Sequence, residues 1–113
     1  MNKPVIKIEP DYQCFPLWRV HNDGLENINI TDLPITEDLK KLLIAWQKKY
    51  DDTLNMLNPM QSGFRNQDEE KKFEKEGVTI YKMMFSELGN YYQIKYFSIL
   101  HGKLFDSLND FEL

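Results

Sequence analysis

Two apolar stripes at helical spacing constrain the fold of this chain more than any other feature of its sequence. The first stripe recurs every three or four residues from Leu39 to Leu54, with lysine and glutamine side chains between its members. This spacing predicts an amphipathic helix over residues 37–56. Thr36 is a good N-cap, because its hydroxyl can accept a hydrogen bond from a free amide of the first turn.

The second stripe covers residues 73–88. Asn66, followed three residues later by Glu69, resembles a capping box and predicts that the second helix begins there. Gly89 is expected to end this helix as a left-handed C-cap. Gly77 lies in mid-helix, where glycine costs about 1 kcal/mol relative to alanine. We therefore expect the first helix or the sheet to approach Gly77 closely.

Strand signals precede the helices. Residues 5–9 alternate in part, with Ile6 and Ile8 on one face, and a proline follows. Residues 12–18 are apolar but interrupted by proline, so that either an edge strand or a packed loop fits. Residues 21–34 are rich in Asn, Asp and Gly, which predicts a loop. Three apolar side chains are expected to attach this loop to the core: Ile28, Ile30 and Leu33.

The strongest strand signal follows the second helix. Residues 91–99 are β-branched and aromatic and contain neither Pro nor Gly. His101-Gly102 is typical of a tight turn, after which residues 103–105 are expected to return as a short antiparallel strand. Residues 106–113 are acidic and are predicted to form a frayed tail.

These elements predict an α+β fold in which two amphipathic helices pack on one face of a small, mainly antiparallel sheet. The length of 113 residues indicates a single domain over residues 1–113. A hydrophobic fraction of 42% and a charged fraction of 28% are typical of globular chains.

Charge and cysteine content narrow the function classes. The net charge of -4 disfavours nucleic acid and anionic membranes as direct partners. Cys14 is the sole cysteine, so no intrachain disulfide can form, and too few other ligands are present for a structural zinc. No signal peptide or membrane span is evident, which makes the cytoplasm the expected compartment. No cofactor is expected.

Catalysis has few candidate residues. His21 and His101 could act as an acid–base pair, but a polar loop and a tight turn are ordinary positions for solvated histidines. Cys14 could act as a nucleophile with His21 as its base, although an apolar neighbourhood favours a small buried side chain. The sequence contains no recognised hydrolase, phosphate-loop or zinc-protease motif.

Carboxylates offer a second kind of site. Six of them are candidate partner-binding residues: Glu69, Glu70, Glu74, Asp51, Asp52 and Glu26. If they cluster with Glu76, they would form an acidic face able to enter the basic groove of a nuclease. The alternative is a solvated helix face, which the interleaved Lys71, Lys72 and Lys75 favour. Exposed tyrosines could supply anchors beside them, while most aromatic rings are expected in the core.

Four segments together carry a family resemblance. They are residues 8–18 (IEPDYQCFPLW), residues 27–35 (NINITDLPI), the helix end from Trp46 to Leu54, and Ser62-Gly63-Phe64 before the acidic second helix. Together they resemble small bacterial proteins similar to the immunity proteins of contact-dependent growth inhibition and other polymorphic toxin systems. The resemblance implies a cytoplasmic antidote that binds a cognate toxin domain, often a nuclease, and blocks its active site. Such families share no functional motif, so no binding residue carries over.

The leading hypothesis is therefore a non-enzymatic toxin inhibitor. A small cytosolic adaptor or housekeeping binding domain is the first alternative, and a small histidine-dependent enzyme is the second. A homodimer remains open, because an exposed aromatic patch would suit a second copy as well as a different partner.

Overall fold

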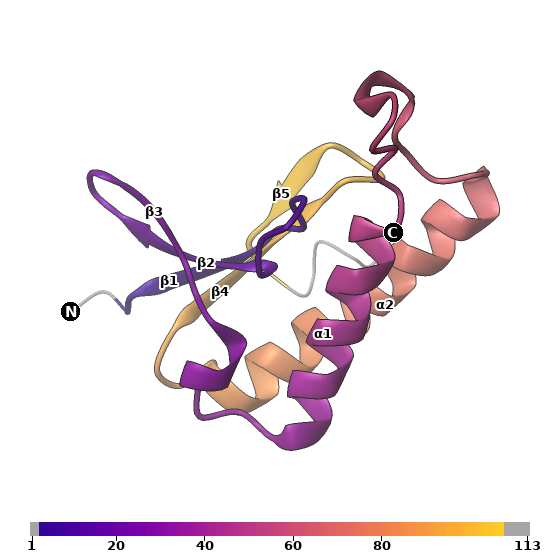
Figure 1. Cartoon of the computed structure of the whole chain (residues 1–113). Helices are drawn as coiled ribbons and strands as arrows, with labels where there is room; N and C mark the ends of the chain where they lie inside the picture. The colour runs from indigo at the N-terminus through magenta and orange to yellow at the C-terminus, as the bar shows by residue number, and fades with distance from the viewer. Residues whose placement is uncertain (1–2, 108–113) are drawn as a thin grey trace.

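The computed structural model describes residues 3–107 and has an α+β fold (Figure 1). A five-stranded sheet has the order β3-β2-β1-β4-β5, with β1 and β4 parallel and the other neighbours antiparallel. Both α-helices pack on the same face of the sheet, which confirms the predicted fold class. The elements are β1 (Val5–Ile8), β2 (Leu17–His21), β3 (Gly24–Asn27), η1 (Ile30–Asp32), α1 (Glu37–Asp51), η2 (Pro59–Gln61), α2 (Gln67–Leu88), β4 (Gln93–Ser98) and β5 (Lys103–Phe105).

The buried side chains of β1 and β4 alternate along each strand, and together they form the sheet side of the core. Ile6 and Ile8 of β1 are fully buried, as their shared face predicted. They align with Ile94 and Tyr96 of β4, which point toward the helices as well. Phe105, paired with Tyr96, extends the same buried face to the edge strand β5 and confirms the predicted C-terminal hairpin.

The region between β1 and α1 is more ordered than the sequence indicated. Residues 12–16 form a turn that leads into β2, so the segment 12–18 is part loop and part strand. The edge-strand alternative is wrong, because β2 pairs with both β1 and β3 and is an interior strand. The expected loop over 21–34 is wrong in part, since it contains β3 and η1. Every residue of β3 is exposed, so β3 has no apolar alternation to detect and is held by pairing with β2. Ile30 and Leu33 are buried, as predicted.

Helix α1 begins as expected and ends earlier. The Thr36 hydroxyl accepts a hydrogen bond from the Leu39 amide at 3.3 Å. The helix ends at Asp51 rather than at residue 56. Beyond it, the Thr53 hydroxyl donates to the Tyr50 carbonyl at 2.6 Å, which takes up a helix-end acceptor and turns the chain away.

Helix α2 begins at the predicted cap. The Asn66 side chain accepts from the Glu69 amide at 2.9 Å, and the Glu69 carboxylate reaches back to the Arg65 amide at 3.4 Å. The left-handed cap expected at Gly89 is wrong, because its φ is -61°. Instead, an added Cβ at Gly89 would collide with the Phe85 carbonyl oxygen.

Gly77 lies where the predicted close approach occurs. A Cβ added there would lie 2.8 Å from Trp46 Cζ2 on α1 and would overlap the Tyr96 hydroxyl on β4. Helix and sheet therefore both require glycine at this position. Trp46 stacks on Phe73 at 4.5 Å between ring centroids and anchors the contact between the two helices.

The structure describes only residues 106–107 of the predicted frayed tail over residues 106–113. Asp106 forms an ion pair with Lys95 at 3.3 Å, while residues 108–113 of the expected tail lie outside the described residues. The single-domain assignment stays a prediction. Within residues 3–107, neither helix has the length and apolar character needed to span a bilayer.

Candidate partner-binding surface

The end of α1 and the start of α2 bring together the largest group of predicted site residues (Figure 1). Asp52 and Glu69 line the same open pocket of about 350 Å³ between these helix ends. Asp51 and Glu70 are their chain neighbours. Asp51 accepts a hydrogen bond from the Gln13 amide at 2.8 Å, so one of these carboxylates also holds the β1–β2 connection in place.

Glu74 does not belong to this exposed surface. Its side chain points at the sheet and the residue is only 7% exposed, which corrects the expectation of a partner-facing carboxylate. The Tyr96 hydroxyl donates to Glu74 at 2.8 Å and the Ser98 hydroxyl donates at 2.7 Å. Burial, together with the neighbouring Glu74 charge, raises the pKa of Tyr96. Glu74 is thus a structural carboxylate of the α2–β4 interface.

Glu26 lies apart from the other candidates. It is exposed on the edge strand β3 and contacts His21 across the β2–β3 hairpin at 2.8 Å. Figure 1 shows this hairpin on the opposite side of the molecule from the α1 end and the α2 start. The six candidates therefore do not form one acidic face.

The pocket between the helix ends carries charges of both signs. Lys49 of α1 pairs with Glu76 of α2 at 2.5 Å, which links the helices across the pocket. Lys72 and Arg65 also line it. Its apolar base contains Phe64, whose ring lies 5.1 Å from the Phe73 ring. Of the three interleaved lysines named from the sequence, Lys72 is the one that lines this pocket.

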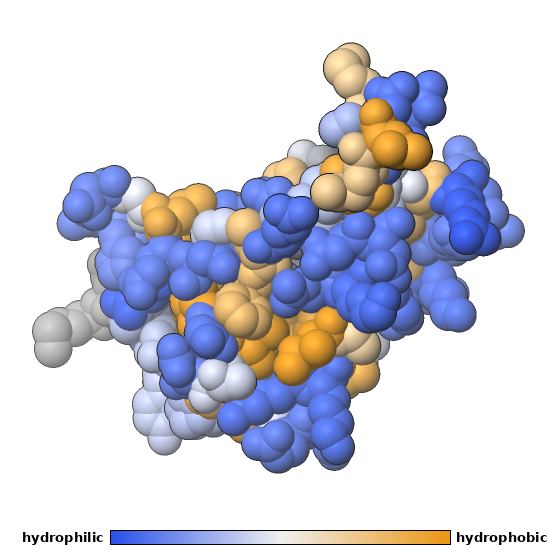
Figure 2. Space-filling model, viewed as in Figure 1, coloured by the Kyte–Doolittle hydropathy of each residue, from blue (hydrophilic) through white to orange (hydrophobic). Residues whose placement is uncertain are grey.

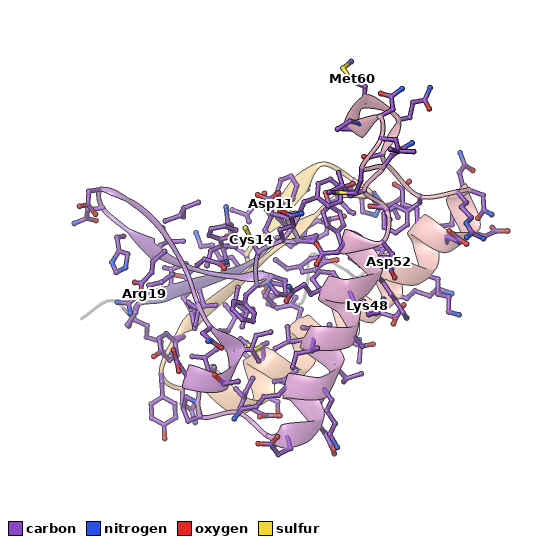
Figure 3. The ribbon with its side chains drawn as sticks, in the orientation of Figure 1. Asp11, Cys14, Arg19, Lys48, Asp52 and Met60 are labelled. Carbon is purple, nitrogen blue, oxygen red and sulfur yellow. The ribbon has the colours of Figure 1, made fainter. Side chains whose placement is uncertain are left out.

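The β1–β2 connection, residues 9–16, carries two carboxylates that are not among the six candidates, Glu9 and Asp11. Tyr12 stacks on Tyr50 at 4.6 Å, and its hydroxyl lies 2.8 Å from the Thr53 hydroxyl oxygen. Burial, then the charges of Tyr12, Asp11 and Glu9, raise the pKa of Tyr50 to about 12. Figure 3 shows Asp11 on this connection and Asp52 beside Lys48 at the end of α1.

A projecting loop is the other feature that sequence reasoning missed. Residues 53–64 connect the helices and extend outward from the body (Figure 1). Met56 is 72% exposed, Leu57 99% and Met60 94%. Figure 2 shows hydrophobic side chains on this loop with hydrophilic side chains below it and a second hydrophobic area lower on the same face, and Figure 3 places Met60 at the outer end of the loop. Its sequence signal is a group of apolar side chains within an otherwise polar, Pro- and Gly-containing connection.

The two histidines are not brought to one site. His21 ends β2 level with the start of β4, whereas His101 lies in the turn beyond the end of β4. Strand geometry separates them by about 20 Å, far beyond what a shared reacting group allows. Cys14 is a free, half-buried thiol. Among residues 3–107, no group of three or more metal-ligating side chains converges.

The exposed aromatic anchors expected beside the acidic residues lie elsewhere. Tyr91 is 68% exposed, but it follows the C-terminal end of α2. The acidic residues occupy the N-terminal end of the same helix, about 30 Å away at 1.5 Å per residue. The expectation that most aromatic side chains lie in the core holds only in part. Among residues 3–107 the buried aromatic rings are Trp46, Phe73, Tyr81, Tyr96 and Phe105, and most of the others are partly buried.

Comparison with known proteins identifies the family. No curated protein matches the chain. A family model described as Serratia CdiI immunity protein-like matches residues 4–99, which include both helices and strands β1 to β4. This match confirms the resemblance carried by the four sequence segments. The chain therefore belongs to the Serratia CdiI immunity protein-like family.

Proposed function

We propose that this protein binds a cognate toxin domain of a contact-dependent growth inhibition system and neutralises it. The family match over residues 4–99 is the observation that carries the proposal. The described structure is consistent with a binding protein, because its largest group of candidate residues lies on an open, charged surface. In this proposal the chain acts as an inhibitor rather than as an enzyme.

We further propose that the toxin is a nuclease and that the chain blocks its active site. A nuclease groove is basic because it must hold phosphates. The exposed carboxylates Asp11, Asp52 and Glu69 would be attracted to such a groove and would accelerate association. Lys49 and Arg65 within the same surface would fix the register by pairing with acidic groups of the toxin. The complex would form in the cytoplasm, where a nuclease toxin meets its substrate.

Glu70 and Asp51 belong to the same proposed surface, as neighbours of Glu69 and Asp52. Glu74 is left out because it is buried. Glu26 would contact the toxin only if the interface also covered the β2–β3 hairpin. A separate substitution can therefore test Glu26.

The experiment starts from the toxin domain encoded beside the gene for this chain. Co-expression should rescue growth and allow co-purification of the two proteins. Stopped-flow association should then slow in Asp52→Lys/Glu69→Lys and depend less steeply on salt. Asp23→Lys/Glu26→Lys on the hairpin changes the net charge equally and serves as the control. Equal slowing by both variants would contradict a localised acidic surface, and failure of the wild-type chain to bind or rescue would refute the proposed function.

A further inference from the structure

The projecting loop differs from the rest of the surface in charge. Residues 53–64 contain no Asp, Glu, Lys or Arg, although such residues make up 28% of the chain. Charged residues border the loop on both sides, with Asp52 before it and Arg65 after it. An uncharged centre within a charged rim is the usual anatomy of a protein interface.

The loop is held in shape by its own hydrogen bonds. The Gly63 amide donates to the Thr53 carbonyl at 2.9 Å and closes the base. Gly63 has a φ of 145°, which favours glycine at the point where the chain turns back. The Asn55 side-chain oxygen accepts from the Leu57 and Asn58 amides at 3.1 and 2.9 Å. A loop ordered in this way loses little conformational freedom on binding.

The three exposed apolar side chains of this loop, Met56, Leu57 and Met60, contribute little to the fold. Leu57 at 99% and Met60 at 94% exposure leave almost all of their surface in water. Scattered single apolar residues are normal on protein surfaces, but here Met56, Leu57 and Met60 lie within one short ordered segment. Methionine side chains also adapt to irregular recesses, which suits them to recognition.

We propose that the projecting loop is the apolar anchor of the toxin interface, with Leu57 and Met60 inserted into an apolar recess of the toxin domain. Asp52 and Arg65, which border the loop, would then pair with groups of opposite charge around that recess. This inference rests on the proposed function and specifies which part of the surface holds the complex together. The carboxylates mainly set the association rate, while the loop mainly sets the dissociation rate.

The test compares Leu57→Ser/Met60→Ser with Leu25→Ser, which removes another exposed apolar side chain from β3. Both variants should keep the wild-type urea midpoint, because these side chains are exposed in the free protein. The loop variant should dissociate from the toxin about 30-fold faster or more, since burial of one leucine side chain is worth roughly that factor. Its association rate and salt dependence should stay close to those of the wild-type chain. Leu25→Ser should leave both rates unchanged.

The outcomes separate this inference from the proposed function. If the wild-type chain binds and the loop variant dissociates at the same rate, the anchor assignment is wrong and the proposed function stands. If the wild-type chain alone forms a dimer in sedimentation analysis and the loop variant does not, the loop serves a second copy and the inference is overturned. If the wild-type chain does not bind the toxin, the proposed function and the inference fail together.

Discussion

Replacing Glu74 by alanine should destabilise the fold, although Glu74 belongs to an acidic stretch that resembles a solvated surface. The substitution removes the acceptor of two buried hydrogen bonds, from Tyr96 at 2.8 Å and Ser98 at 2.7 Å. Hydrogen bonds to a charged group contribute about 1.5–3 kcal/mol each, so the gross loss is about 3–6 kcal/mol. Removing a buried carboxylate returns part of this through its desolvation cost. We expect a net loss of about 3 kcal/mol.

The free energy of unfolding can be measured by urea denaturation followed by circular dichroism, with linear extrapolation to water. Glu74→Gln keeps one acceptor oxygen and should lose only about 1 kcal/mol. Glu70→Ala on the same helix is the control and should change stability by less than about 0.5 kcal/mol. A Glu74→Ala protein as stable as the Glu70→Ala protein would show that the buried carboxylate contributes nothing to the α2–β4 contact.

This prediction also affects how the toxin interface should be mapped. A loss of about 3 kcal/mol is a large share of the roughly 5–15 kcal/mol that holds a domain folded. A charge reversal at Glu74 would therefore reduce toxin binding by unfolding the chain, without any contact between Glu74 and the toxin. Charge reversals at Asp52 and Glu69 reduce this ambiguity, because both side chains are exposed and, among the described residues, the Glu69 carboxylate makes only the 3.4 Å capping contact with the Arg65 amide. The urea midpoint of this variant should therefore be measured beside its association rate.

Two further predictions concern Gly77 in the core and the hydroxyl of Tyr50. Gly77→Ala gains about 1 kcal/mol of helix propensity, but the new Cβ would lie 2.8 Å from Trp46 Cζ2 and overlap the Tyr96 hydroxyl. We expect steric overlap to win, with a net destabilisation of about 1–3 kcal/mol, and a melting temperature equal to or above that of the wild type would contradict this. The second prediction concerns Tyr50, whose pKa is raised from 10.0 to about 12 in the folded chain. Between pH 10 and pH 12 the unfolded chain therefore loses the Tyr50 hydroxyl proton, while the folded chain keeps it. Stability should therefore fall as pH rises from 10 toward 12, and Tyr50→Phe should flatten that fall in chemical denaturation; an unchanged slope would refute the assignment.

Local signals predicted the helix starts correctly because capping involves residues only a few positions apart. Thr36 and Asn66 each accept the hydrogen bond that their spacing indicated. The helix ends were predicted less well. Gly89 was expected to supply a left-handed turn, whereas the nearby Phe85 carbonyl is what excludes a side chain at that position. At the end of α1 the amide and the hydroxyl of Thr53 both donate to the Tyr50 carbonyl, an arrangement that the apolar stripe does not indicate.

The sequence by itself determined the two helices, the buried faces of β1 and β4, and the family of the chain, because each of these is encoded in patterns along the chain. Only the tertiary structure decided that β3 exists, since an exposed edge strand has no apolar alternation and depends on its partner. Only the tertiary structure separated Glu74 from Glu69, because α2 turns one carboxylate toward β4 and the other toward solvent. The tertiary structure also decided that Met56, Leu57 and Met60 remain outside the core. An apolar side chain tends to be buried, but whether it is buried depends on whether the packed chain offers space for it.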